Sequence, residues 1–215
     1  HNHGSVDLHS LGGFITNPLS LRPRRPASSA GCLAFPGGFL LHTGYPNPGL
    51  NKALRLWAPA WARSPVPVLV SLLLQNTSEV ATMLETLEGK PGVAGVEISL
   101  PSGAEPHDLL SVTQAAFSEL AVVLRLPLDQ AERMLQGIVD DLLGAGLAAI
   151  SLGPPRGALV NPQGRLVHGR LYGPAIYPQN LSVTHALVST GLPVISAGGV
   201  YSQAQVAELL AVGAS

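Results

Sequence analysis

Six short apolar runs recur along the chain, and each of them is a candidate β-strand. Within a run, apolar residues follow one another almost without a break, instead of alternating with polar residues. That pattern is typical of parallel strands that are covered on both faces. The runs predict a buried parallel sheet with strands at Gly13–Thr16, Val66–Leu74, Gly95–Leu100, Leu120–Leu126, Leu147–Gly153 and Leu192–Gly198.

Between these runs, apolar residues recur at the spacing of amphipathic helices. Each helical pattern ends at a glycine, which favours a helix C-terminus. The patterns cover residues 78–89, 129–144, 180–191 and 202–213. Strands and helices that alternate in this way form either a (β/α)8 barrel or an open doubly wound sheet.

The number of strands falls short of a closed barrel. Residues 202–213 read as a helix that leads into a further strand, and residues 6–13 as a helix that leads into the second strand of a barrel. We therefore expect residues 6–215 to form one α/β domain of the (β/α)8 TIM-barrel type, incomplete at both ends, with about six to seven strands. Residues 1–5, HNHGS, read as the remnant of a purification tag and are set aside.

Two long segments interrupt the repeat. Residues 17–65 and 154–178 are rich in proline, glycine and arginine, and each follows a predicted strand. Loops of this length in a compact domain are usually functional or disordered. In a barrel they would lie at the carboxyl ends of the strands, over the active site.

Composition excludes several classes of protein. Hydrophobic residues make up 46% of the chain and charged residues 12%, with a formal net charge of −1 and no long basic block. Nothing in this balance indicates a nucleic-acid partner. No apolar run reaches the roughly 18–20 residues of a membrane span. The single cysteine, Cys32, cannot form an internal disulfide and fits a reducing compartment, so we expect a cytoplasmic protein.

The pair Gly198-Gly199 follows the last predicted strand and precedes a helix. Because these residues lack side chains, backbone N–H groups can approach an anion there, and the N-terminus of the helix adds favourable potential. Phosphate groups commonly bind at this position in barrels. A tight turn with positive φ explains the same two glycines, so the residues alone leave both interpretations open.

Several short motifs occur in the order and spacing of one family. They are LGGFITNPLSLRPRR, FPGGFLLHTGYPNPGLNKAL, VPVLVSL, GVEISLPSG, LAVVLRLP, RG at 156–157, YGPAIYP and LPVISAGGV. Together they resemble the dihydroorotate dehydrogenases, most closely the soluble class 1 enzymes, over residues 6–215. The resemblance implies an FMN-binding (β/α)8 barrel that oxidises dihydroorotate to orotate in pyrimidine biosynthesis. It also implies a small-molecule ligand, and either a homodimer or a partner subunit for electron transfer.

The same resemblance implies a set of cofactor-binding residues. Gly198 and Gly199 correspond to half of the flavin phosphate site, and Arg125 stands where the family has a flavin-contacting lysine. Asn17 stands at a second family lysine, near flavin and substrate. Gly173 lies in the motif YGPAIYP.

The positions that the resemblance assigns to the substrate depart further from the family. Asn47 of the Asn-Pro-Gly motif is retained, but Glu97 stands at a substrate-binding asparagine. The residue that should accept the substrate's proton is Cys or Ser in the family, and here it is Leu100, which cannot accept a proton. Ser99 and Ser102 flank Leu100 and are the candidates for a displaced hydroxyl base.

Glu97 also has an interpretation that does not need a ligand. A carboxylate on an apolar strand must be buried with a partner. Arg125 on the next predicted strand can supply that partner, so we expect the two side chains to pair on the inner face of the sheet.

Other changes at the expected site leave the function open. Leu41 stands at a family asparagine and Gly153-Pro154 at a family Asn-Thr, while His42 and His168 are acid–base candidates on the two long segments. The motifs favour an FMN-dependent oxidoreductase. The changed site favours a non-catalytic homologue that uses the barrel as a binding or structural module. A flavin-free barrel that acts on a phosphorylated metabolite is a third possibility, supported by the glycine pair alone.

Overall fold

The computed structural model describes residues 7–28, 31–101, 103–116 and 119–215. Ser102 and residues 1–6, which include the assigned tag remnant, lie outside this part. The largest element is a parallel sheet, and each of the six apolar runs overlaps one of its strands, as predicted. In spatial order these strands are β1 (Phe14–Ile15), β4 (Val68–Leu73), β5 (Val93–Ser99), β6 (Ala121–Pro127), β7 (Ala149–Gly153) and β10 (Val194–Ile195).

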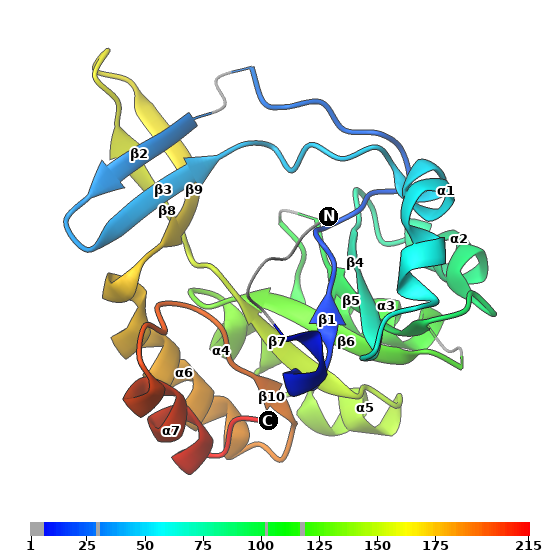
Figure 1. The fold of residues 1–215 in the computed structure, drawn as a ribbon. Coiled ribbons are helices and arrows are strands. Elements are labelled where there is room, and N and C mark those ends of the chain that lie inside the picture. The colour runs from blue at the N-terminus through cyan, green and yellow to red at the C-terminus, as the bar shows by residue number, and fades with distance from the viewer. Residues whose placement is uncertain (1–6, 29–30, 102, 117–118) are drawn as a thin grey trace.

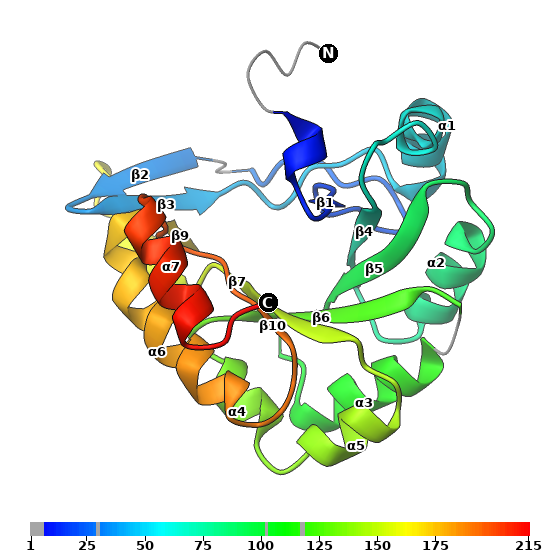
Figure 2. The same ribbon diagram turned by 60° about the horizontal axis from the view of Figure 1, so that its bottom comes forward.

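This sheet curls into part of a barrel, with its helices on the convex side (Figure 2). A doubly wound sheet would instead carry helices on both faces. The curled sheet therefore confirms an incomplete barrel of the TIM type and excludes the open alternative.

The helices are short. They are α1 (Leu50–Trp61), α2 (Glu79–Leu87), α3 (Pro106–Ala115), α4 (Ala131–Leu135), α5 (Val139–Gly144), α6 (Tyr177–Val188) and α7 (Gln203–Ala211), with 3-10 turns η1 (Leu8–Ser10) and η2 (Pro174–Ile176). The longest, α1 and α6, have 12 residues each. Within the described residues, no helix combines the length and the apolar character that crossing a bilayer requires.

The prediction of one helix over residues 129–144 is wrong. The chain forms α4 and α5 there, separated by Gly137 at a φ of +75°. A left-handed residue ends a helix, and glycine adopts that conformation without a steric cost. The apolar spacing concealed the break because Met134 and Leu142, on either side of it, are both buried.

Side chains of the central strands alternate between the two faces of the sheet. Those on the convex face pack against the helices and are fully buried; they include Val70, Leu72, Val96, Ile98, Leu124 and Ile150. The alternating positions on the concave face carry polar side chains, among them Ser71, Glu97, Arg125 and Ser151. The apolar core thus lies outside the barrel wall, and polar chemistry lies inside it.

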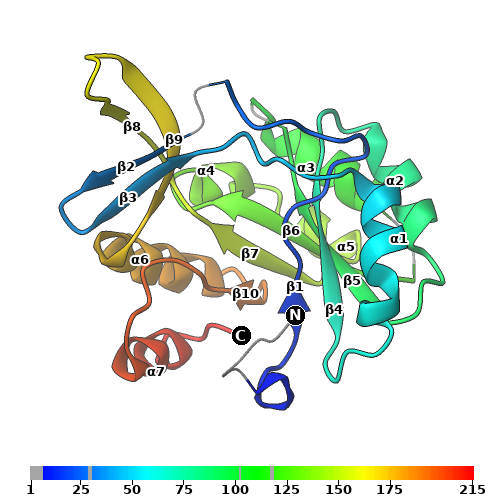
Figure 3. The ribbon, with the colours of Figure 1, turned by 45° about the horizontal axis from the view of Figure 1, so that its top comes forward.

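A second, antiparallel sheet is formed by the two long segments that interrupt the repeat (Figures 1 and 3). Its strand order is β2 (Gly31–Phe35), β3 (Gly38–His42), β9 (Leu166–Tyr172) and β8 (Arg156–Val160). Each segment folds into a hairpin, and β3 pairs with β9 through Leu40 and Leu171. Both segments were predicted to be loops, and for residues in these strands that prediction is wrong. The sequence does not reveal the sheet because its two hairpins pair with each other over a long distance in sequence.

Glycines join the second sheet to the barrel. A Cβ atom on Gly38 would overlap the carbonyl oxygen of Tyr172, and one on Gly173 would overlap the backbone at Gly37. A Cβ atom on Gly199 would overlap the first residue of α6. The β2–β3 turn, the start of η2 and the loop after β10 therefore pack backbone against backbone, which only glycine permits at these distances.

We expect Gly173→Ala to destabilise the protein more than Gly164→Ala does. Both residues have positive φ, at +125° and +74°, but a Cβ on Gly164 has no atom within 4 Å. The conformational cost of alanine is about 1–2 kcal/mol at Gly164. At Gly173 it is about 1–3 kcal/mol, because a φ of 125° with a ψ of 174° is a conformation almost confined to glycine. Overlap with the β2–β3 turn should add about 1–3 kcal/mol at Gly173 alone. Urea unfolding measures both free energies, and equal losses would show that the glycine contact contributes nothing.

Candidate functional site

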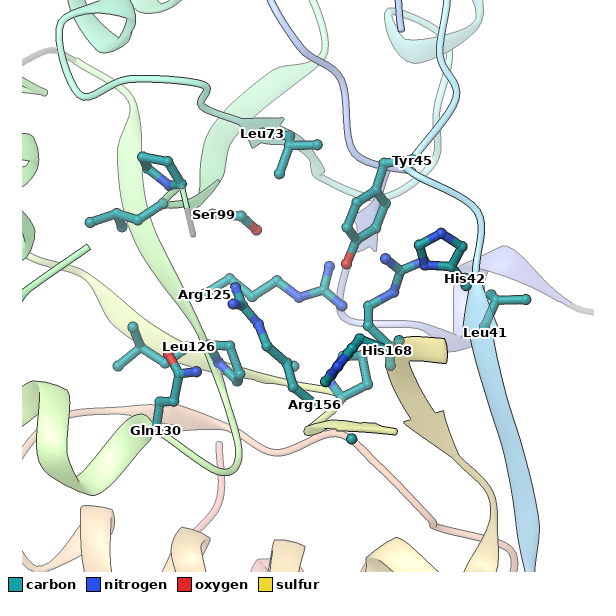
Figure 4. A pocket seen from close by; sticks show the side chains of 18 of the residues that line it. Leu41, His42, Tyr45, Leu73, Ser99, Arg125, Leu126, Gln130, Arg156 and His168 are labelled. Atoms are coloured by element: carbon teal, nitrogen blue, oxygen red, sulfur yellow. The ribbon is translucent and has the colours of Figure 1, made fainter. Parts of the chain in front are cut away.

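Two adjoining cavities lie between the concave face of the barrel and the second sheet. The larger, of about 720 Å³, is lined by the carboxyl ends of β5, β6 and β7 and by residues of β3, β8 and β9 (Figure 4). The smaller, of about 480 Å³, lies nearer the carboxyl ends of β1 and β10. Both volumes fall in the range of small-molecule sites, roughly 300–1,000 Å³. The residues that line both cavities are Leu41, Thr43, Tyr45, Arg125 and Arg170.

Glu97 is buried in the barrel interior, with 3% of its surface exposed. Ser71 Oγ donates a hydrogen bond of 2.7 Å to Glu97 Oε2, and Ser151 Oγ donates one of 2.7 Å to Oε1. The guanidinium of Arg125 lies 3.4 Å from Oε2. The expected contact between Glu97 and Arg125 is thus confirmed, and both carboxylate oxygens are satisfied within the chain.

Strand register brings these four side chains together. Ser71 pairs with Glu97 between β4 and β5, and Arg125 pairs with Ser151 between β6 and β7. Ser71 and Ser151 were not singled out from the sequence. The sequence could have indicated them, because each is the one polar residue in an otherwise apolar strand.

Leu100, at the expected base position, is half-buried and lines the larger cavity while packing against the hydrophobic core. Ser99 lines the same cavity, and its side-chain oxygen points into it (Figure 4). The hydroxyl of Ser99 has no hydrogen-bond partner among the described residues. Ser102, the other candidate base, lies outside the described residues.

The structure does not bring every expected residue to the cavities. Asn17 is exposed and lines the smaller one. Asn47 lines neither, because its side chain is engaged within the chain: Oδ1 accepts from the backbone amides of Ser20 and Gly49, at 3.2 and 2.9 Å, and Nδ2 donates to the carbonyl of Tyr45 at 3.0 Å. Asn47 thereby holds the segment that leads from β3 to α1.

Gly173 and the pair Gly198-Gly199 lie at the contact between the second sheet and the barrel. Gly173 is buried against the β2–β3 turn and lines neither cavity. Asn180 Nδ2, on α6, donates to the carbonyl of Gly198 at 3.0 Å. The amides of Gly198, Gly199 and Val200 have no acceptor in the described part of the chain. These three residues line neither cavity, but the preceding Ala197 lines the smaller one. Successive free amides beside a cavity are suited to an anion.

Tyr45 is a site residue that the sequence did not reveal. Its φ of +54° is positive, which among the described residues is found at no other position except glycines. The guanidinium of Arg170 lies over the Tyr45 ring, 3.6 Å from its centroid, and the hydroxyl points towards Arg125 (Figure 4). Burial raises the pKa of Tyr45, and the charges of Arg170, Arg125 and Arg156 act against that rise. Strained backbone is concentrated at functional sites, so this residue belongs to the candidate site.

His42 and His168 both line the larger cavity. Cys32 is exposed on β2. Within the residues that the structure describes, no three His, Cys, Asp or Glu side chains are grouped so that they could bind a metal ion.

Parallel strands that curl into part of a barrel, with cavities at their carboxyl ends, define the chain as an incomplete (β/α) barrel. No family model matches the sequence. Over 233 residues the chain is 28% identical to the catalytic subunit of dihydroorotate dehydrogenase B (NAD(+)) from Desulforudis audaxviator, covering 97% of this chain and 74% of that protein. The protein of the same name from Geotalea uraniireducens is 29% identical over 231 residues, covering 98% and 74%.

A dihydroorotate dehydrogenase structure from Eimeria tenella, solved with ferulenol, matches with a TM-score of 0.72 at 13% identity and covers 96% of this chain and 68% of that one. A putative chitinase A from Streptomyces coelicolor matches less well, with a TM-score of 0.52 at 12% identity, covering 95% and 83%. These structural matches support the fold. By its sequence, the chain is similar over nearly its whole length to curated dihydroorotate dehydrogenases, at 28–29% identity.

The buried contact between Glu97 and Arg125 should contribute more to stability than an exposed ion pair of the same length. Arg133 and Glu105 are also 3.4 Å apart, but both side chains are more than half exposed. In double-mutant cycles with Glu→Gln and Arg→Met, we expect a coupling energy of at least about 1.5 kcal/mol for the buried pair. The exposed pair should give less than about 0.5 kcal/mol. Equal couplings in urea unfolding would contradict this assignment.

Proposed function

We propose that this chain is the FMN-binding barrel of a dihydroorotate dehydrogenase-like oxidoreductase, which oxidises dihydroorotate or a related small molecule. The observation that carries the proposal is the run of free amides at Gly198, Gly199 and Val200, directly after Ala197, which lines the smaller cavity. It occurs in a chain whose curated relatives are named dihydroorotate dehydrogenase B.

The residues present fit FMN. The three amides would hold its phosphate, since successive free backbone N–H groups in a loop form a site suited to an anion. Asn17 and Arg125, which line the smaller cavity, would flank the flavin ring. Glu97 presents no unpaired charge to a flavin, because Ser71, Ser151 and Arg125 satisfy its carboxylate. When bound, FMN supplies the hydride acceptor.

Proton removal is the weak step in this site. Leu100 cannot accept a proton, and Ser99 is the described hydroxyl next to it in the larger cavity. A serine without an adjacent base is a poor proton acceptor at neutral pH. We therefore propose Ser99 as the acceptor and expect slow turnover of dihydroorotate.

A non-catalytic homologue is the second candidate function, and Leu100 at the base position is the observation that favours it. In that case the cavities would bind ligand without oxidising it. Flavin content alone does not separate the two functions, whereas reduction of bound flavin by substrate does.

The relatives are named catalytic subunits, which implies a partner subunit in those proteins. We extend this to the present chain and propose an electron-accepting partner, or a homodimer, in the cytoplasm. The proposed place in metabolism is pyrimidine biosynthesis, on the same basis.

FMN should bind at least about tenfold more tightly than riboflavin, because charge-assisted hydrogen bonds from the three amides can form only with the phosphate. Titration of the protein into each flavin, followed by fluorescence, measures both dissociation constants. Equal affinities would mean that the amides after β10 do not hold a phosphate group. Absence of FMN binding would reject the proposed cofactor.

Leu100→Cys should accelerate reduction of bound FMN by dihydroorotate at least about tenfold, since a positioned general base contributes roughly 100- to 10,000-fold. The matched control is Leu73→Cys, which places a thiol at another half-buried position of the larger cavity. Loss of flavin absorbance under anaerobic conditions gives the rates. If FMN is bound but neither the wild type nor Leu100→Cys is reduced, the non-catalytic function is correct.

A further inference from the structure

Basic side chains line the larger cavity, and no Asp or Glu is found among the described residues that line it. The basic residues are Arg125, Arg156, Arg170, His42 and His168. The whole chain has a formal net charge of −1, with 12 Lys and Arg against 13 Asp and Glu, so this excess of positive charge is local. A concave site with charge of one sign concentrates ligands of the opposite sign.

Arg170 is held in place by neutral groups. Its Nε donates to the hydroxyl of Tyr172 at 3.2 Å, one terminal nitrogen donates to Thr43 Oγ1 at 3.2 Å, and the guanidinium lies over the ring of Tyr45. These contacts fix the position of the cation without neutralising its charge. A guanidinium has further N–H donors, which remain available to a ligand.

Arg156 and Arg125 differ in how far their charges are balanced. The guanidinium of Arg125 faces the Glu97 carboxylate at 3.4 Å. The guanidinium of Arg156 has no hydrogen bond or ion pair with any described residue; the nearby Asp129 accepts instead from the backbone amide of Arg156 at 3.0 Å. The charge of Arg125 is balanced by Glu97, whereas Arg156 and Arg170 have no counter-charge among the described residues.

These groups face one space. Figure 4 shows Arg125, Arg156 and His168 converging on the cavity below the Tyr45 hydroxyl. The charges of Arg170, Arg125 and Arg156 all lower the pKa of Tyr45 against the effect of its burial. All three guanidinium groups therefore lie close enough to the Tyr45 hydroxyl to lower its pKa.

We infer that the larger cavity binds a small molecule with at least two negative charges, either a pair of carboxylates or a doubly charged phosphate, held between Arg156 and Arg170. Guanidinium groups pair with carboxylate and phosphate through parallel hydrogen bonds. The cavity, at about 720 Å³, has the size of a small-molecule site. The inference does not depend on flavin binding, because the amides proposed for the flavin phosphate follow Ala197, which lines the smaller cavity. It concerns the cavity in which Ser99 is proposed to meet the substrate, and it names the charge of the molecule bound there.

The test compares ligands that differ by one anionic group. Succinate is compared with monomethyl succinate, and glycerol 3-phosphate with glycerol, by calorimetric titration of the full chain without added flavin at constant ionic strength. In at least one pair, the dianion should bind at least about tenfold more tightly than its partner. The pair that shows the difference identifies the ligand as dicarboxylate or phosphate. If neither pair shows it, the inference is wrong, whatever the outcome with FMN.

Two arginines of the same hairpin provide matched variants. Arg156→Gln should weaken binding of the dianion at least about tenfold. Arg165→Gln should change it less than about twofold, because Arg165 lies exposed in the β8–β9 turn and does not line the cavity. The Arg156 side chain has no partner to lose, so this variant should fold, which circular dichroism verifies; Arg170→Gln is the second variant. Equal effects of Arg156→Gln and Arg165→Gln would mean that the dianion is attracted only by the overall positive charge of the hairpin, and the inference would be wrong.

Discussion

Backbone contact between glycine-bearing turns holds the second sheet against the barrel, and both cavities lie between these two units. Among the described residues, the two sheets share no strand. The β2–β3 turn, the start of η2 at Gly173 and the loop at Gly199 approach so closely that a single Cβ would separate them. Because Arg156 and Arg170 lie on the second sheet, and Glu97 and Arg125 on the barrel, the same contact sets the spacing of the charged groups.

The interior of the barrel shows how a buried charge is accommodated. Desolvation of a carboxylate is costly unless partners replace its water, and Glu97 receives two serine hydroxyls and one guanidinium. A carboxylate satisfied in this way has little capacity left for a ligand. In the proposed site, recognition would therefore rest less on Glu97, where the family resemblance places it, than on the groups around it that still have free donors.

The barrel strands could be predicted from the sequence because each is a continuous apolar run, and burial on both faces produces such a run whatever the neighbours are. The pairing of Glu97 with Arg125 was predictable for a related reason, since a buried carboxylate requires a cation on an adjacent strand. The hairpins β2–β3 and β8–β9 were not, because their pairing joins Leu40 to Leu171 over a distance that no local pattern records. The break between α4 and α5 at Gly137 could not be predicted for a different reason, because the residues on both sides of it keep the apolar spacing of a single helix.

The site residues also divide into those that the sequence could place and those that it could not. Leu100 and Ser99 lie where strand order predicts them, at the end of β5. Asn47 does not reach a cavity, because its amide side chain satisfies backbone groups of its own turn, a use that sequence position does not distinguish from ligand binding. The conformation of Tyr45 could not be foreseen, because positive φ is rare for an aromatic residue and is imposed by its surroundings.

Tyr45 and Arg170 form a wall shared by the two cavities, so the ligands proposed for the two cavities would influence each other. Positive φ at Tyr45 costs about 1–3 kcal/mol, which the surrounding contacts must offset. Asn47 fixes its carbonyl, and Arg170 covers its ring. An anion bound to Arg170 in the larger cavity reduces the positive potential in the smaller one, because Arg170 lines both. If the proposed ligands bind, the distribution of charge around this wall, and not only the replacement of the base by Leu100, would determine which of them the barrel can hold at the same time.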